Sequence, residues 1–179
     1  MWVPPNLKFE LDDCTKPWTW PENTFDFIHM RYLAGAIADW DALLKEAYRT
    51  CQPGGWVQSC EADAAYRSDD GSLSDDSAFG SGLSRLFLEG GKKLGRSFQV
   101  VSEDLQKKGM EAAGFTDIHV ADYKVSFTPL SGGKEIWVGG GVANGVADVV
   151  TCRSLSAHGR ATPSSARSAS TPSWPCTTI

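Results

Sequence analysis

The sequence predicts an α/β fold, in which helices cover a layered and largely parallel sheet. Apolar runs typical of buried strands alternate with helical patterns, in the order strand, strand–helix–strand, helix, strand, strand, and turn residues separate them. Crossovers in such sheets are right-handed, and ligands bind beyond the carboxyl ends of the parallel strands. We therefore expect functional residues directly after strand ends.

Two strands are expected in the N-terminal part of the chain. Lys8–Leu11 is a short extended run that ends in Asp12 and Asp13. A turn at 21–24 leads into the mostly apolar and aromatic run 25–30. An apolar run of this kind suits a strand that is covered on both faces.

A helix is expected next, because apolar residues recur at helical spacing. Asp39 is its expected N-cap. Residues 52–55, which include two glycines, are expected to end the helix, and 56–60 form the next predicted strand. The apolar stripe consists of Trp40, Leu43, Leu44, Ala47, Tyr48 and Cys51.

The segment 61–82 is acidic and rich in glycine and serine. We expect a mobile loop at the substrate face, and a merely solvated loop is the alternative for any single residue. Apolar residues between 83 and 94 predict a weak helix that breaks near Gly90 and Gly91.

A last helix is expected to begin with Ser102 as its N-cap and to end at Gly114. Glu103 suits the positive end of this helix. After the helix, 115–120 reads as a strand, and 123–127 is interpreted as its hairpin partner.

Charge is distributed unevenly along the 179 residues. Residues 1–138 carry 21 acidic and 14 basic side chains, a net charge of −7, whereas 139–179 carry one acid, three arginines and no lysine. The acidic part argues against a general nucleic-acid binder, which needs a basic face. The sequence contains no run of about 18 apolar residues, so no membrane span is expected.

Metal and disulfide sites are not expected either. The five cysteines are widely spaced without a C-x-x-C pair, and the three histidines do not cluster with them. The N-terminal residues lack the pattern of a secretory signal. Reduced thiols in an intracellular protein, cytoplasmic or nuclear, are the expectation.

Several short stretches carry a specific order and spacing: Phe9–Asp13, Pro17–Arg31, Ala38–Trp40, Lys45–Arg49, Pro53–Val57 and Leu105–Ile118. In this combination, residues 3–128 resemble the class I S-adenosylmethionine-dependent methyltransferases. The resemblance is strongest to the fungal branch that includes regulators of secondary metabolism. It implies a Rossmann-like sheet, S-adenosylmethionine as the cofactor and methyl transfer as the activity.

The resemblance implies an adenine-binding acid after the family's third strand, beside a backbone N–H. Asp12 or Asp13, followed by Cys14, occupies this place, and the spacing to Asp26 favours Asp13. A carboxylate accepts strongly from an exocyclic amine, which suits this role. A solvated pair of turn residues is the alternative.

The resemblance also places His29, Met30 and Arg31 at the methionine end of the cofactor, after the fourth strand. Methyl transfer from a sulfonium is a direct displacement without a metal, so the protein mainly aligns the reactants and excludes water. A base is needed only for a protonated acceptor, and His29 is the candidate. A packed residue at a strand end is the alternative for His29, and the sequence does not identify the acceptor.

Two features of the family do not occur in this sequence: the G-x-G-x-G turn after the first strand and the ribose-binding acid after the second. In this fold, strands one and two lie between strands three and four. Without them, Lys8–Leu11 has no neighbour and the fourth strand exposes an edge. We therefore expect a partial Rossmann-like sheet, of the region of strands 3 to 7 only, in an N-terminally truncated chain that binds S-adenosylmethionine weakly or not at all.

The chain is expected to divide into a partial methyltransferase domain at 1–138 and a low-complexity, disordered tail at 139–179. A regulatory extension is one interpretation of the tail. Translation in a shifted frame or through an intron is the other, and it is favoured because acids and lysines vanish together. Either origin makes the tail an aberrant addition to the family pattern.

Three functions follow from these observations. The first is an S-adenosylmethionine-dependent methyltransferase in incomplete or inactive form. The second is a non-catalytic, methyltransferase-like module that binds a partner protein. The third, a nicotinamide-dependent enzyme, is weaker because it too needs a Gly-rich turn.

Overall fold

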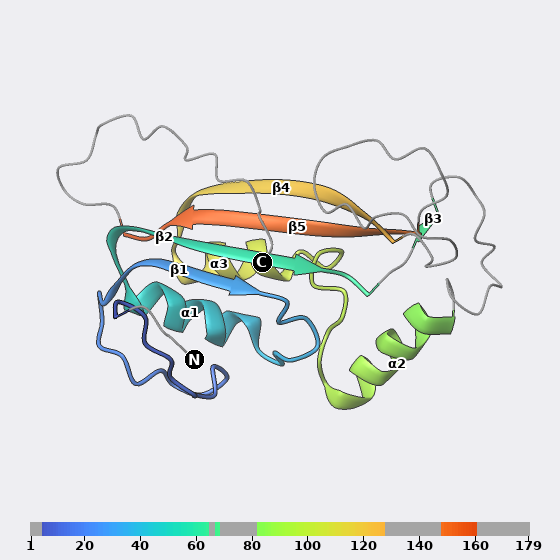
Figure 1. Cartoon of the computed structure of the whole chain (residues 1–179), viewed down its shortest axis with the longest axis horizontal. Helices are drawn as coiled ribbons and strands as arrows, with labels where there is room; N and C mark the ends of the chain where they lie inside the picture. The colour runs from blue at the N-terminus through green and yellow to red at the C-terminus, as the bar shows by residue number, and fades with distance from the viewer. Residues whose placement is uncertain (1–4, 65–66, 69–81, 128–147, 161–179) are drawn as a thin grey trace.

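The structure is a computed structural model, and it describes residues 5–64, 67–68, 82–127 and 148–160 (Figure 1). Within these ranges the chain forms a five-stranded mixed sheet and three helices. The strands are β1 (Phe25–Arg31), β2 (Cys51–Ala62), β3 (Arg67–Ser68), β4 (Thr116–Phe127) and β5 (Asp148–His158). The helices are α1 (Trp40–Thr50), α2 (Ser84–Leu94) and α3 (Leu105–Ala113). The predicted α/β class is confirmed.

The sheet has the order β1-β2-β5, with β4 on the far side of β5. β1 and β2 are parallel, whereas β5 runs antiparallel to both β2 and β4. α1 and α3 cover one face of the sheet, and α2 stands apart beyond the carboxyl end of β2 (Figure 1). The core lies between the sheet and these two helices, where Ile28, Val57 and Leu155 meet Leu44 and Met110.

α1 follows its sequence prediction closely. Asp39 has an extended backbone, and its carboxylate accepts the N–H of Ala42 at 2.9 Å, which satisfies one orphan donor of the first turn. Trp40, Leu43 and Leu44 are buried, as the apolar stripe predicts. The helix ends at Thr50, and β2 follows at once, so that the expected stop at 52–55 lies inside a strand.

Asp39→Ala is expected to lower the free energy of unfolding by about 1 kcal/mol, because it removes the cap of α1. Asp39→Asn keeps an acceptor at the same place and is expected to leave stability within a few tenths of a kcal/mol of wild type. Urea denaturation followed by circular dichroism measures both. Equal losses in the two variants would show that the cap contributes nothing.

The predicted break near Gly90 and Gly91 is wrong, because α2 continues through both residues. A Cβ at Gly91 would lie 2.5 Å from the carbonyl oxygen of Arg96 and 2.8 Å from the Phe98 ring. Glycine is therefore present here for close packing and does not mark a helix end.

The start of α3 also differs from its prediction. The helix begins at Leu105 after Asp104, whereas Ser102 bonds elsewhere and does not cap it. Gly114 ends the helix with φ +100°, as predicted, because this left-handed conformation favours glycine.

The predicted hairpin of 115–120 and 123–127 is wrong. Thr116–Phe127 is one continuous strand, β4, which pairs along its length with β5, from His119↔Ser156 to Phe127↔Asp148. The partner strand comes from a distant part of the sequence, so local pattern could not identify it.

The expectation that residues 139–179 lack structure is wrong for Asp148–His158. These residues form β5 between β2 and β4, with Leu155 and Ala157 fully buried in the core. Residues 139–147 and 161–179 lie outside the described residues.

The predicted strand Lys8–Leu11 does not join the sheet. Phe9 is 78% exposed and Leu11 is fully exposed, consistent with a segment that has no neighbouring strand. β1 is accordingly the first strand of the sheet, with β2 as its one partner among the described residues. Within the same residues, no helix is long and apolar enough to cross a membrane.

Candidate functional site

The carboxyl ends of β1 and β2 lie at the same end of the sheet, because the two strands are parallel. The segments that follow them meet a third segment, 95–104, which connects α2 to α3. The N–H of Gly35 donates to the Ser97 carbonyl at 3.0 Å, and the N–H of Ala64 donates to the Phe98 carbonyl at 3.0 Å. These three segments form the candidate site.

Glu61 joins the exits of the two strands. Its side chain is fully buried, and its carboxylate accepts the N–H groups of Leu33 and Ala34, each at 2.9 Å. Burial raises the pKa of this carboxyl, and the two backbone N–H groups act in the opposite direction. The loop after β1 is thus fixed to the end of β2 by a buried acid.

Asp63 fixes the third segment in the same way. The Asp63 carboxylate accepts the N–H of Val101 at 2.7 Å and the N–H of Ser102 at 2.8 Å, and it also accepts the Ser102 hydroxyl. Asp63 is 6% exposed, so these bonds lie in a largely dry environment. The prediction of a solvated or mobile loop at 61–82 is therefore wrong for its first residues, and most of the others lie outside the described residues.

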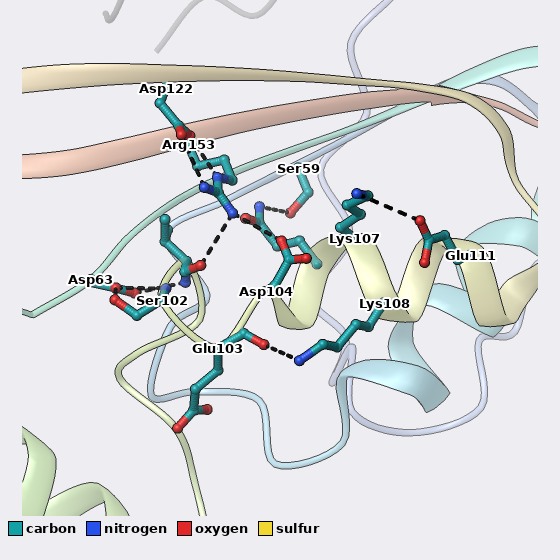
Figure 2. Close-up of polar contacts among 12 residues, drawn as sticks. Ser59, Asp63, Ser102, Glu103, Asp104, Lys107, Lys108, Glu111, Asp122 and Arg153 are labelled. Carbon is teal, nitrogen blue, oxygen red and sulfur yellow. Dashed lines mark hydrogen bonds and ion pairs between the residues drawn. The ribbon is translucent and has the colours of Figure 1, made fainter.

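Arg153 of β5 holds the opposite side of that segment (Figure 2). Its guanidinium bonds both carboxylate oxygens of Asp122 at 2.6 and 3.0 Å, the Asp104 carboxylate at 2.9 Å and the Val101 carbonyl at 3.2 Å. The Arg153 hydrogen bond lowers the pKa of Asp122. Asp104 has φ +58°, a conformation that is costly for a residue with a side chain, and Arg153 helps to hold it.

The predicted adenine-binding residues lie in an exposed turn before β1. Asp12 accepts the N–H of Asp13 at 2.8 Å, and Asp13 accepts the N–H and hydroxyl of Thr15 at 3.0 and 2.7 Å. The Thr15 bonds lower the pKa of Asp13, with smaller effects from the charges of Lys16 and Arg96. Arg96 also donates to the Gly35 carbonyl at 3.5 Å. The backbone carbonyl of Cys14 accepts the indole N–H of Trp18 at 3.1 Å.

The other predicted residues lie on β1 and point in two directions. Met30 is buried in the core. His29 is exposed on the opposite face, where its Nδ1 lies 3.0 Å from Oε1 of Gln58 and its ring stacks on Phe27. The Arg31 guanidinium lies over the Tyr32 ring, 4.6 Å from its centroid. These three residues therefore do not converge on one point.

Glu61, Asp63 and Arg153 were not among the predicted site residues. The acids at 61 and 63 immediately follow the predicted strand 56–60, and their alternation places both on the side of the sheet that α3 covers. That spacing is a usable signal. No sequence signal pointed to Arg153, because it lies in the segment whose composition suggested disorder.

The sequence family described as "Methyltransferase domain" matches residues 3–120, more than half of the chain. The chain belongs to the class I S-adenosylmethionine-dependent methyltransferase family. This chain is similar to fungal members of the family, as its short sequence stretches predicted. It is 34% identical over 124 residues to the methyltransferase pytC of Aspergillus terreus. This match covers 69% of this chain and 37% of the relative. It is 31% identical over 128 residues to the secondary metabolism regulator LAE1 of Cochliobolus heterostrophus. This match covers 70% of this chain and 40% of that relative.

The fold comparison agrees with the sequence comparison. An S-adenosylmethionine-dependent methyltransferase of Methanosarcina mazei matches with a TM-score of 0.52 at 11% identity, over 87% of this chain and 68% of that chain. This likeness concerns the fold alone. The chain spans about two fifths of the length of the fungal relatives named above.

S-adenosylmethionine is the cofactor of this methyltransferase family, and the described residues fit only one end of it. The exposed carboxylates of Asp12 and Asp13 suit the amine and hydroxyl donors of adenosine. Gly35, the first glycine after β1, has φ +73°, but a Cβ there would lie 2.1 and 2.2 Å from ring atoms of Phe98. The Phe98 ring thus fills the space beside Gly35, which is not open to a ligand. Among the described residues, Gly35 therefore offers no open space for the methionine end of the cofactor.

Proposed function

We propose that this chain provides the acceptor-side scaffold of an S-adenosylmethionine-dependent methyltransferase and that, alone, it binds the cofactor weakly and does not turn over. The buried carboxylate of Glu61 carries this proposal. It fixes the exit of β1 to the exit of β2, at the sheet end where α/β folds bind ligands. Such rigid positioning is what direct methyl transfer requires of a protein.

The residues have distinct roles in this proposal. Asp13, with Asp12 beside it, accepts the adenine amine, and the backbone N–H of Cys14 lies next to them. Met30 and Arg31 belong to the strand that leads to the methionine end. His29 is the candidate base for a protonated acceptor. Its Nδ1 contact with Gln58 fixes the orientation of the ring on the open face of the sheet.

Calorimetric titration of the full chain with S-adenosylmethionine tests the proposal. We expect a dissociation constant of about 1 mM or weaker, a binding free energy of roughly −4 kcal/mol. Asp13→Asn is expected to abolish the residual binding, whereas Glu89→Gln, on α2, is expected to leave it unchanged. Stoichiometric binding in the micromolar range would refute the proposal.

A second candidate function is a non-catalytic module that binds a partner protein. Among the described residues, no strand pairs with the outer edge of β1, and this favours the module, because an unpaired strand edge is a ready surface for pairing with another chain. Crosslinking with labelled S-adenosylmethionine separates the two functions: labelling at Asp12–Cys14 supports the scaffold, and no labelling at saturating cofactor supports the module.

A further inference from the structure

The turn that carries the proposed adenine contacts is bonded to a tryptophan that follows it. The N–H of Lys16 donates to the Asp13 carbonyl at 3.0 Å, which closes the turn. The indole N–H of Trp18 donates to the Cys14 carbonyl at 3.1 Å. This second bond comes from outside the turn and holds its middle peptide group.

The peptide between Cys14 and Thr15 links the tryptophan to the acid. The C=O and N–H of a peptide group lie in one plane and point in opposite directions. The C=O of this peptide accepts the Trp18 indole, and its N–H donates to the Asp13 carboxylate at 3.0 Å. Trp18 and Asp13 thus hold opposite ends of one rigid unit. Without the indole bond this peptide can rotate, and the Asp13 carboxylate loses its fixed direction.

The backbone of Trp18 is itself fixed to α1. Its N–H donates to the Glu46 carboxylate at 2.8 Å, and its C=O accepts the Arg49 guanidinium at 3.0 Å. Arg49 also pairs with Glu46 at 2.8 Å and donates to the Trp20 carbonyl at 3.0 Å. The pair is partly buried, at 28% and 24% side-chain exposure, so water screens it less than a surface pair. A folded helix therefore sets the position of Trp18.

Packing sets the direction of the indole ring. Trp18 is half-buried and packs against the core, and its ring meets the Trp20 ring edge to face, with centroids 5.7 Å apart. Trp20 packs in turn on Phe25, with centroids 5.3 Å apart. Continuous contacts thus lead from the core and α1 through the Trp18 indole to the adenine turn.

We propose that Trp18 is a positioning residue of the adenine site. Its indole N–H holds the Cys14–Thr15 peptide and thereby directs the Asp13 carboxylate, together with the neighbouring Cys14 N–H, towards adenine. This inference rests on the proposed function, because it takes Asp13 as the acceptor of the adenine amine. Trp18 itself contacts no ligand in this proposal, and a tryptophan that only packs the segment on α1 would not need its N–H.

Amide hydrogen exchange of the full chain, followed by NMR, tests the positioning without a ligand. Trp18→Phe removes the indole N–H and keeps an aromatic ring. It is expected to speed exchange of the Thr15 and Lys16 amides about fivefold, the factor that one typical net hydrogen bond supplies, and to leave the α1 amides unchanged. Trp20→Phe, at the neighbouring half-buried tryptophan, is the matched control and is expected to leave both turn amides as in wild type. Equal exchange at Thr15 in wild type and Trp18→Phe would overturn the proposal.

A second variant keeps the test valid if Trp18→Phe does not fold, which the α1 amides report. Glu46→Ala removes the acceptor of the Trp18 N–H and is expected to speed exchange at Thr15 in the same direction. Unchanged exchange at Thr15 in a folded Glu46→Ala chain would then overturn the proposal.

Titration with adenosine, followed by the NMR signal of the Cys14 amide, separates this proposal from the proposed function. Adenosine is expected to shift this signal in wild type, with a dissociation constant that rises about fivefold in Trp18→Phe. Inosine lacks the exocyclic amine and is expected to leave the signal in place. No shift with adenosine in wild type would refute the adenine role of Asp13 and both proposals with it. Equal dissociation constants in wild type and Trp18→Phe would overturn only the positioning role of Trp18.

Discussion

Glu61→Ala is expected to lower the free energy of unfolding by about 3–5 kcal/mol. The variant leaves the N–H groups of Leu33 and Ala34 without their acceptor in a buried place, at about 1–3 kcal/mol for each group, and it also leaves a cavity. This is a large share of the stability of a typical domain. Urea denaturation followed by tryptophan fluorescence measures the loss.

Glu89→Ala is the control for this experiment. Glu89 pairs with Arg85 on the exposed surface of α2, and such a pair contributes about 0–1 kcal/mol. A loss at Glu61 no larger than the loss at Glu89 would show that the buried clamp does not stabilise the domain.

The pH dependence of Glu61→Gln follows from the raised pKa of the native carboxyl. A carboxyl whose pKa is higher in the folded state binds more protons there, so wild type loses stability as pH rises from the ordinary value of 4.5 towards the raised folded value. Glutamine does not titrate, so the free energy of unfolding of the variant does not change in this way. As pH rises over this range, wild type is therefore expected to lose stability relative to Glu61→Gln. A difference that stays constant with pH would contradict the raised pKa.

Arg153→Ala is expected to lower the free energy of unfolding by about 2–3 kcal/mol. It removes the bonds to Asp122, Asp104 and Val101, and it leaves two carboxylates without their shared cation. Solvent screens part of this effect, because Asp122 is 47% exposed. Arg153→Lys is expected to recover less than half of the loss, because an ammonium group cannot bond both oxygens of Asp122 as the guanidinium fork does.

The Arg153 experiment also tests whether β5 belongs to the native fold. The pKa of Asp122 is lowered by Arg153, so its stabilising effect is complete above the ordinary value of 3.8 and is lost as pH falls below that value. In Arg153→Ala, the loss of stability below this pH that comes from Asp122 is expected to disappear. Arg85→Ala, at an exposed arginine of α2, is the control. Equal stability of Arg153→Ala and Arg85→Ala would mean that Arg153 does not hold Asp122 and Asp104 in the native fold.

Local patterns predicted the parts of the fold that depend on local physics. α1 was predictable because Asp39 caps it and an apolar stripe repeats at helical spacing, and the end of α3 was predictable from Gly114. Gly91 misled the prediction of α2, because a glycine that permits close packing looks the same in sequence as one that ends a helix.

Features that depend on distant residues were not predictable. Serine is a common N-cap residue, but the Ser102 hydroxyl donates its hydrogen bond to the carboxylate of Asp63, 39 residues earlier. β4 was divided into a hairpin because its partner β5 could not be recognised in a segment poor in acids and lysine. Of the candidate site, the acidic stretch after β2 was expected at the substrate face, while the clamping role of Glu61 became visible only with the Leu33 and Ala34 contacts. The roles of Asp12, Asp13, Cys14, His29, Met30 and Arg31 stay predictions.

The position of β5 determines the order in which this sheet can assemble. Gln58 and Ser154, which bond across β2 and β5, are 96 residues apart in sequence, so closing this contact carries the entropic cost of a long loop. β4 pairs with β5 and with no other strand among the described residues. During synthesis, β2 and β4 therefore emerge before the strand that joins them. Until β5 is made, each has an unpaired edge where β5 will later bind. β5, the last of the described strands to be made, joins β2 to β4 in one late step, and any delay in that step prolongs the time in which the nascent chain can aggregate.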